Sequence, residues 1–438
     1  MPPAASIFET VELAPPDPIL NTAAMYKADT HPQKVNLGIG AYRTEEGVPW
    51  VLPVVRKAEG ELLQELGTEN DKEYAPIDGL PGMKKATQNL IFGKSDPRIA
   101  STQALSGTGA LRIVGEFMAR FLGYKKVYYS DPTWGNHPTI FEKSGMVVEK
   151  YPYWNAEKKS IRVKEWIAHI NAAEPGALYI IHPCAHNPTG MDPSLDEWKQ
   201  IMEALIAKKC VSILDSAYQG YATGSLETDR KVIEMFLNHP ANLEFFVCQS
   251  FAKNLGLYGE RIGMVHAVCS SEERANAVLS QMKMVIRPMY SSPPIHGAQI
   301  VTKILSSEAL YKQWCAELKL MADRILEVRT GLRKGLEEKG TPGTWNHITD
   351  QIGMFSFTGL SPEMCEKLIK DHHIYLLKSG RISLAGLNQA NLQYVIDSID
   401  QVVRSESTSA NPKGCVPCLP GSGRSSRKSS GDGAAARM

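Results

Sequence analysis

The chain contains 438 residues, of which 43% are apolar and 22% are charged, close to the averages of globular proteins. This composition excludes a collagen, a coiled coil and a generally disordered chain, and the length suggests two or three domains. The 48 basic and 47 acidic residues nearly balance, so the chain lacks the basic surplus of a nucleic-acid-binding protein. No stretch of about 18 apolar residues is present, and we expect no transmembrane helix.

The first 14 residues are rich in proline and alanine and are expected to form an extended arm. Glu9 and Glu12 come early, and the first arginine is Arg43, unlike the Arg-rich and acid-poor transit peptide of mitochondrial proteins. No basic segment precedes an apolar core, so a secretory signal is not expected. Six cysteines stand singly in apolar or helical surroundings, which suits a reducing compartment. Cys415 and Cys418 lack the second pair that a zinc site needs, so we expect a cytoplasmic protein without a metal site.

Short apolar runs in the middle of the chain alternate with longer amphipathic stretches. The stretches at 194–208 and 228–238 predict helices, and the runs predict buried strands. This alternation predicts an α/β fold with a mostly parallel sheet and helices on both faces. In such a sheet the site lies beyond the carboxyl ends of the strands. The predicted strands are 126–129, 178–182, 211–214, 245–248 and 263–268.

The first informative polar segment is Ser106-Gly107-Thr108-Gly109, which precedes a helical pattern. The start of a helix offers free N–H groups and the positive end of its dipole to an anion, so a phosphate cradle is one interpretation. An ordinary helix cap is the other, and this segment alone favours the cap. A dinucleotide fingerprint is excluded because Arg112 stands where its third glycine would be.

Two further polar groups follow predicted strands. Asn-Pro-Thr-Gly at 187–190 comes soon after His182 and is a turn signal, but the Asn187 side chain could also donate to a ligand oxygen. Asp215 closes the apolar run 211–214. A buried acid is costly unless it meets a cation or a metal, and capping of the next turn is the competing explanation.

Lys253 stands three residues after Ser250 and eight before Arg261. A lysine in a partly dry site has a lowered pKa and can form a Schiff base, whereas a lone lysine is usually a solvated surface group. Ser250 and Arg261 both suit a phosphate. With Asp215 and the 106–108 segment, these residues supply an amine for an aldehyde, a carboxylate for a pyridinium nitrogen and a phosphate cup. One cofactor needs all three, pyridoxal 5'-phosphate.

The pattern changes near residue 306. A long charged helical stretch at 308–339 is followed by what we interpret as short strands and turns up to about residue 404, which indicates a second, smaller α+β domain. Residues 405–438 are rich in serine, glycine and proline, contain five basic and two acidic residues, and are expected to form a disordered basic tail.

Taken together, five motifs resemble those of the class I aspartate aminotransferases, a fold-type I pyridoxal-phosphate family, over about residues 5–404. The resemblance implies a large domain with a mostly parallel seven-stranded sheet flanked by helices, plus a smaller α+β domain. The implied division is an arm at 1–14, a small domain at 15–50 and 321–404, a large cofactor-binding domain at 51–320 and the tail at 405–438. The motifs are 35–43, 106–109, 187–190, 249–261 and 379–382.

For the cofactor, the resemblance implies that Lys253 is the Schiff-base lysine, which also moves the proton between the substrate Cα and the cofactor. Asp215 would keep the pyridine nitrogen protonated, and Tyr218 and Asn187 would donate to the phenolate oxygen of the ring. Trp134 would stack on the ring, although a loop tryptophan packed on a helix is the plain alternative. The implied phosphate ligands are Ser106, Gly107, Thr108, Ser250 and Arg261.

For the substrate, the resemblance implies that Arg381 clamps the α-carboxylate with two hydrogen bonds. Arg287 would bind the distal carboxylate from the neighbouring subunit, and Tyr74 and Ser291 would reach the other subunit's phosphate. Each site would then need two chains, so the resemblance implies a homodimer with shared sites and an arm that crosses to the partner. The implied substrate-binding residues are Gly40, Trp134, Asn187, Arg287 and Arg381.

The implied reaction is a reversible ping-pong transfer of the amino group from L-aspartate to 2-oxoglutarate, which gives oxaloacetate and L-glutamate. A broader aromatic or kynurenine aminotransferase is the alternative within the family. A penicillin-recognising serine hydrolase would explain Ser-x-x-Lys at 250–253, but its middle Ser-Asp-Asn element is missing. A DNA-binding regulator on the same fold would need more than the 30 residues before the fold. The terminal tripeptide at 436–438 loosely resembles the Ser-Lys-Leu peroxisomal address.

Overall fold

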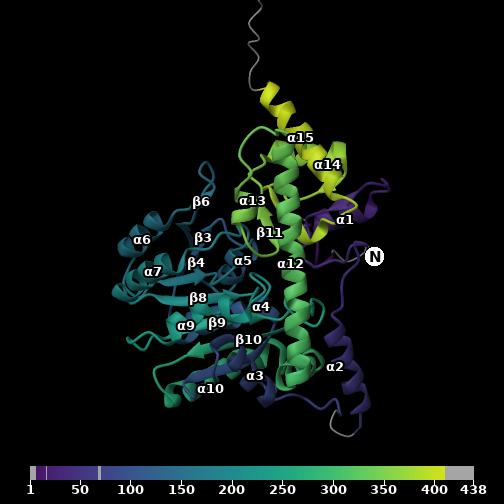
Figure 1. Cartoon of the computed structure of the whole chain (residues 1–438). Helices are drawn as coiled ribbons and strands as arrows, with labels where there is room; N and C mark the ends of the chain where they lie inside the picture. Colours follow the sequence, from purple (N-terminus) through teal and green to yellow (C-terminus); the bar gives the residue numbers. More distant parts are fainter. Residues whose placement is uncertain (1–5, 16, 68–70, 410–438) are drawn as a thin grey trace, which may run out of the picture.

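The computed structural model describes residues 6–15, 17–67 and 71–409. Its main sheet has seven strands, and Figure 1 shows this sheet to the left of the long helix α12 (Glu308–Glu338). The strand order is β2-β10-β9-β8-β7-β3-β4, where β10 is antiparallel to both of its neighbours and the other pairs are parallel. The prediction of a mostly parallel seven-stranded sheet is therefore confirmed. The strands are β2 (Ile99–Leu105), β3 (Lys126–Asp131), β4 (Val147–Pro152), β7 (Leu178–Ile181), β8 (Val211–Ser216), β9 (Phe245–Ser250) and β10 (Ile262–Val268).

All five predicted strands are present, within two residues of their predicted ends, but β2 and β4 were not predicted. β2 contains Ser101, Thr102 and Gln103, all buried. These polar residues interrupt the apolar run by which a buried strand is recognised. The Ser101 hydroxyl lies 2.8 Å from Nδ1 of His266, and the Gln103 side-chain amide donates to the Pro294 carbonyl (2.7 Å). β4 lies at the edge of the sheet and is largely exposed, so it lacks an apolar run.

Helices cover both faces of the sheet, as the side chains of β7 illustrate. Leu178 and Ile180 pack in a cluster with residues of α4, α5 and α10, whereas Tyr179 and Ile181 pack in a second cluster with α3, α6, α7 and α9. This is the alternation that a strand buried on both sides requires. The helices are α3 (Pro81–Phe92), α4 (Ser106–Phe121), α5 (Asn136–Glu142), α6 (Val163–Ala172), α7 (Leu195–Ala207), α8 (Leu226–Asp229), α9 (Lys231–Leu237) and α10 (Glu272–Tyr290).

The two helices predicted beside the sheet differ in accuracy. α7 starts where Ser194 and Glu197 form a reciprocal capping box, a signal that is visible in the sequence. The stretch predicted at 228–238 is interrupted, because α8 ends at Asp229 and α9 begins at Lys231.

The longest helix is α12 (Glu308–Glu338) with 31 residues, as predicted for 308–339. Its first part packs against α2 (Pro53–Gln64) and α11 (His296–Ser306) beside the sheet, and its second part against α13 (His347–Asp350) and α15 (Leu392–Ser409). Figure 1 shows α12 running along the molecule between these groups. The predicted boundary between residues 320 and 321 lies inside this helix, and the division into domains stays a prediction.

The remaining elements are small sheets and further helices, of which α13, α15 and the 3-10 helix η1 (Leu384–Gly386) contact α12. β1 pairs with β12 in parallel, β11 pairs with β13 in antiparallel fashion, and β5 and β6 form a hairpin. The elements are α1 (Pro18–Ala28), β1 (Val35–Asn36), β5 (Trp154–Asn155), β6 (Ser160–Ile161), β11 (Phe355–Phe357), α14 (Pro362–His372), β12 (Ile374–Tyr375), β13 (Arg381–Ser383), the 3-10 helix η1 (Leu384–Gly386) and α15.

Two predictions for the C-terminal part need correction. The interpretation of 340–404 as short strands and turns is wrong where α14 and α15 form helices of 11 and 18 residues. α15 also continues to Ser409, so the tail does not begin at residue 405. Residues 410–438 lie outside the described residues. At the other end, residues 6–14 of the predicted arm are exposed and contain no helix or strand. Among the described residues, no helix has both the length and the apolarity to span a bilayer.

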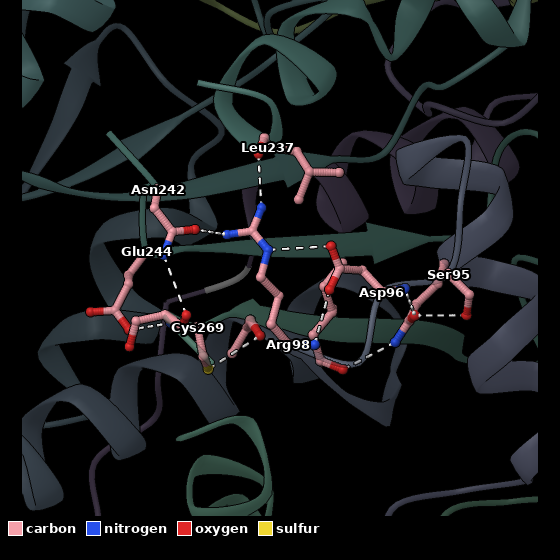
Figure 2. Close-up of polar contacts among 11 residues, drawn as sticks. Ser95, Asp96, Arg98, Leu237, Asn242, Glu244 and Cys269 are labelled. Carbon is pink, nitrogen blue, oxygen red and sulfur yellow. Dashed lines mark hydrogen bonds and ion pairs between the residues drawn. The ribbon is translucent and has the colours of Figure 1, made fainter. Parts of the chain in front are cut away.

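Arg98 holds together the edge of the sheet where β9 begins (Figure 2). Its guanidinium donates to Asp96 Oδ2 (3.2 Å), to Asn242 Oδ1 (2.5 Å) and to the carbonyl of Leu237 (2.8 Å). The Arg98 carbonyl accepts the amide of Cys269 (2.9 Å), the residue after β10. The network thus ties the start of β2 to the α9–β9 connection and to the end of β10.

Candidate active site

The sheet topology brings the ends of several strands together on the side of the sheet where β9 ends, opposite to Arg98. β2 and β9 run the same way because both are antiparallel to β10, which lies between them. Ser106 follows β2, Ser250 ends β9 and Arg261 directly precedes β10, so these three residues meet. The hydroxyls of Ser106 and Ser250 are 2.9 Å apart. Asp215 lies near the end of β8, the next strand.

A cavity of about 220 Å³ opens at this edge. Twelve of the predicted site residues line it, together with three that were not predicted: His182, Ala217 and Phe355. The predicted residues are Gly40, Ser106, Gly107, Thr108, Trp134, Asn187, Asp215, Tyr218, Ser250, Lys253, Arg261 and Arg381.

One end of the cavity forms an anion cup at the start of α4. No side chain caps this helix start, so its first N–H groups remain available to an anion. Gly263 of β10 makes the close approach possible, since a Cβ there would lie 2.4 Å from the carbonyl oxygen of Gln249 and 2.8 Å from the carbonyl carbon of Ser106. Arg261 adds positive charge at the same end. Hydroxyls, helix N–H groups and a guanidinium together suit a phosphate dianion.

Asp215 supplies a buried carboxylate, only 6% exposed. Nε2 of His137 lies 2.9 Å from its Oδ2, and Nδ1 of His137 lies 2.8 Å from the Thr133 hydroxyl. Burial by itself would raise the pKa of Asp215, but the hydrogen bond from His137 and the positive charge of Lys253 outweigh it, and the pKa is lowered. Burial lowers the pKa of His182 to about 3. The site therefore holds an ionised carboxylate beside a neutral imidazole.

Lys253 supplies an amine to the same cavity. Its Nζ lies 5.9 Å from the ring centroid of Tyr218 and makes no hydrogen bond or ion pair with the described residues. Burial, and next the positive charges of Arg261 and Arg381, lower the pKa of Lys253 to about 8 against the opposing effect of Asp215. About one tenth of the amine is therefore neutral at pH 7 and can act as a nucleophile or a base.

Arg381 also lines the cavity and is 4% exposed. Its Nη2 donates to the carbonyl of Gly38 (2.8 Å), its guanidinium lies 4.1 Å from the Phe355 ring centroid, and its Nε has no partner among the described residues. Burial lowers the pKa of Arg381 to about 10, so it stays charged at neutral pH. Asn187 is also buried, with an unpartnered Oδ1. Buried polar atoms normally have hydrogen-bond partners, so the unpartnered Arg381 Nε and Asn187 Oδ1 indicate that a polar ligand binds here.

Three predicted residues lie outside this cavity. Tyr74 is 85% exposed, and Arg287 is exposed on α10. The Arg287 guanidinium donates to the hydroxyl of Ser291 (2.5 Å). Their predicted roles at the site of a partner subunit stay predictions.

The sequence interpretation missed His137, His182 and Phe355. His137 follows Trp134 by three residues and His182 follows β7 directly, so proximity to predicted elements was a signal for both. Phe355 lies in a short strand of the second part, and no pattern marks it.

Comparison with known proteins agrees with this geometry. The family described as "Aminotransferase class I and II" matches residues 32–399. Aspartate aminotransferase 3, chloroplastic, of Arabidopsis thaliana is 48% identical over 91% of this chain and 89% of its own.

Two solved structures give the same result and confirm the predicted fold-type I architecture. The aspartate aminotransferase from Saccharomyces cerevisiae cytoplasm shares 43% identity and a TM-score of 0.89, covering 92% of this chain and 100% of its own. An aromatic-amino-acid aminotransferase from Burkholderia pseudomallei, covalently bound to pyridoxal phosphate, shares 40% and a TM-score of 0.87, covering 91% and 100%. A cavity that offers a free lysine amine, a buried carboxylate and an anion cup on this fold leads to one conclusion: the chain belongs to the class I and II aminotransferases.

Proposed function

We propose that this chain is a pyridoxal-phosphate-dependent aspartate aminotransferase, which reversibly transfers the amino group of L-aspartate to 2-oxoglutarate. The observation that carries the proposal is the placement of the Lys253 amine, the Asp215 carboxylate and the Arg381 guanidinium around one cavity. Relatives named aspartate aminotransferases, at 43–48% identity over nearly the whole fold, support the same activity.

The residues present fit pyridoxal phosphate. The hydroxyls of Ser106 and Ser250 and the start of α4 would hold the phosphate, and Asp215 would hold a proton on the pyridine nitrogen. When bound, the cofactor supplies an aldehyde that takes up the amino group and a ring that withdraws electrons from the substrate α-carbon. Trp134, which lines the cavity, would cover one face of the ring.

The side chains of this chain would divide the remaining tasks. Nζ of Lys253, with its lowered pKa, is suited to accept a proton from the substrate α-carbon and to return it. Asp215 stays ionised because His137 donates to it. Arg381 would bind the α-carboxylate, and Gly40 would allow close approach, since a Cβ there would meet Phe355 Cζ at 2.6 Å.

The second carboxylate of aspartate requires a cation that this cavity does not supply. The cationic side chains that line it within the described residues are Lys253, Arg261 and Arg381, and each already has a task. We therefore propose that Arg287 of a second copy binds the distal carboxylate, and that Tyr74 and Ser291 of that copy reach the phosphate. The enzyme would then be a homodimer with shared sites.

A steady-state substrate panel on the cofactor-loaded protein tests the activity. Aspartate with 2-oxoglutarate should give the highest kcat/KM. A preference for phenylalanine, tyrosine or kynurenine would instead support the alternative of an aromatic aminotransferase. The similarity to the Burkholderia aromatic-amino-acid aminotransferase is the reason to test it.

Mixing two inactive variants tests the shared site. Lys253→Ala and Arg287→Asp should each be inactive toward aspartate, but a hybrid dimer contains one site with both native residues. Activity that returns on mixing would support sharing, and its absence would contradict it. Arg274→Asp, an exposed substitution on the same helix, is the matched control and should stay active without mixing.

We also propose a cytoplasmic location, which the similarity to the enzyme from yeast cytoplasm supports. The terminal tripeptide remains a candidate peroxisomal address. A fluorescent reporter fused to residues 405–438 tests it, because a diffuse signal would dismiss the address.

A further inference from the structure

Arg329 is a charged residue that the reaction outlined above does not use. It lies in the second part of α12, it is 1% exposed, and it forms no ion pair with a described carboxylate. Burial lowers the pKa of its guanidinium to about 9. A buried cation without a counter-ion is costly, so its contacts need an explanation.

All of its hydrogen bonds go to the backbone of one segment, residues 348–355. Nη1 donates to the carbonyl of Ile348 (2.7 Å), and Nη2 donates to those of Gly353 (2.9 Å) and Phe355 (2.5 Å). Three carbonyls bound by one planar group are fixed in direction as well as in distance. Arg329 thus determines where the segment ends and where Phe355 begins β11.

Phe355 connects this segment to the substrate cavity. Its ring lines the cavity, lies 4.1 Å below the guanidinium of Arg381 and would be the first atom group to meet a side chain at Gly40. The segment also contacts the Asn187 turn, where the Ile352 amide donates to the carbonyl of Gly190 (2.7 Å). A shift of the segment would therefore move the support of Arg381 without touching Lys253 or Asp215.

We infer that Arg329 is a positioning residue for the α-carboxylate site, acting through Phe355 on Arg381. The inference rests on the proposed function only in that the substrate carries an α-carboxylate. Because every amino acid does so, the experiment can use whichever amino acid the unaltered protein turns over, and a failure of the aspartate assignment remains distinguishable.

The test compares Arg329→Lys and Arg329→Met with Arg333→Met in the cofactor-loaded enzyme. Arg333 is the matched control: it lies one turn further along α12 and donates to the side-chain hydroxyl of Thr349 (2.6 Å), not to the backbone carbonyls that lead to Phe355. We expect KM for both the amino acid and the keto acid to rise about tenfold in Arg329→Met, as for loss of one charged hydrogen bond, with a smaller rise in Arg329→Lys. Values of kcat should change little, and the control should change neither constant.

Two readouts separate positioning from a purely structural role. The absorption maximum of the bound cofactor and its attachment by borohydride should not change, because the altered contacts do not include Lys253 or Asp215. In a Phe355→Leu background, Arg329→Lys should raise KM much less than in the native background, because the effects of two residues that act through each other are not additive.

Several results would overturn the inference. They are unchanged KM values in folded Arg329 variants, equal effects in Arg333→Met, additive effects with Phe355→Leu, or a loss confined to thermal stability. If Arg329→Met does not fold, Arg329→Lys and the Phe355→Leu cycle still decide the question.

Discussion

Two groups of charged side chains lie at opposite edges of the same sheet, and they differ in how completely they are paired. At the edge where β9 begins, the Arg98 guanidinium reaches a carboxylate, a side-chain amide and a backbone carbonyl (Figure 2). At the edge where β9 ends, the Lys253 amine and Nε of Arg381 have no partner among the described residues. Polar groups with hydrogen-bond partners in the protein stabilise the fold, whereas buried polar groups that face a cavity without such partners indicate a ligand-binding site.

The difference separates stability from activity in a way that substitutions can measure. Removal of a charged group at the paired edge should reduce the free energy of unfolding and leave the reaction intact. Removal of a charged group at the cavity should reduce activity and leave the free energy of unfolding nearly unchanged, because the native protein gains little stability from a group without a partner.

The largest expected effect is that of Lys253→Ala. Loss of the amine removes both the nucleophile and the proton carrier, so turnover should fall by roughly 10⁴-fold or more. Borohydride should no longer attach the cofactor to the protein. Steady-state assays and mass spectrometry measure both, with Lys199→Ala on the exposed side of α7 as the control. Turnover near the native value would refute the role of Lys253.

Asp215→Asn and Asp96→Asn apply the same chemical change to the two edges. At the cavity, a neutral amide cannot hold a proton on the pyridine nitrogen, and kcat should fall roughly 10²-fold, as for loss of one electrostatic stabiliser. Asp96→Asn weakens the Arg98 pair and should lower the unfolding midpoint in urea with kcat unchanged. Equal losses of activity in both variants would contradict the proposal that one side of the sheet serves stability and the other serves activity.

The pH dependence of cofactor uptake sharpens the comparison further. With its pKa lowered from 10.5 to about 8, Lys253 is neutral in about one tenth of the molecules at pH 7. The rate at which cofactor-free protein takes up pyridoxal phosphate should therefore rise about tenfold from pH 7 to its plateau, with a midpoint near 8. A midpoint near 10.5 would mean that the amine is not perturbed.

The same pKa shift has a consequence for stability. Between pH 8 and 10.5 the unfolded chain keeps a proton on Lys253 that the folded chain has released. Stability relative to Lys253→Met should thus rise with pH across this window and level off above it. Urea unfolding of both cofactor-free proteins at several pH values measures the difference, and a fall with pH would contradict it.

The smallest expected effect on activity is that of Arg98→Met. The variant loses a charge-assisted network of partly buried groups and should be destabilised by about 2 kcal/mol. Its kcat and KM should stay within about twofold of the native values, as for a substitution far from the site. A tenfold change in either constant would show that the two edges are coupled.

The residues that we propose to carry the chemistry were found from the sequence because each lies in a local motif. Asp215 lies near the end of an apolar strand, and Lys253 and Asn187 lie three and six residues after such strands. The parallel topology that brings these positions together follows from the alternation of strands and helices. The cavity confirms that they lie together.

The rest depends on contacts between distant parts of the chain. His137 binds Asp215 across 78 positions, and Phe355 reaches Arg381 through the pairing of β11 with β13. No local pattern encodes such contacts. The missed α14 differs, since Ser361 caps it and Pro362 begins it, a start signal that the sequence does display.

Gly263 also limits how this family member can change by mutation. Interior strand positions usually accept a β-branched residue, yet the space beside Gly263 is taken up by the backbone of β9 and of the first residue of α4. Even one methyl group would push apart the two strands whose ends form the anion cup. In a saturation library selected for growth on the transamination product, this codon should remain invariant while its neighbours in β10 accept other apolar residues.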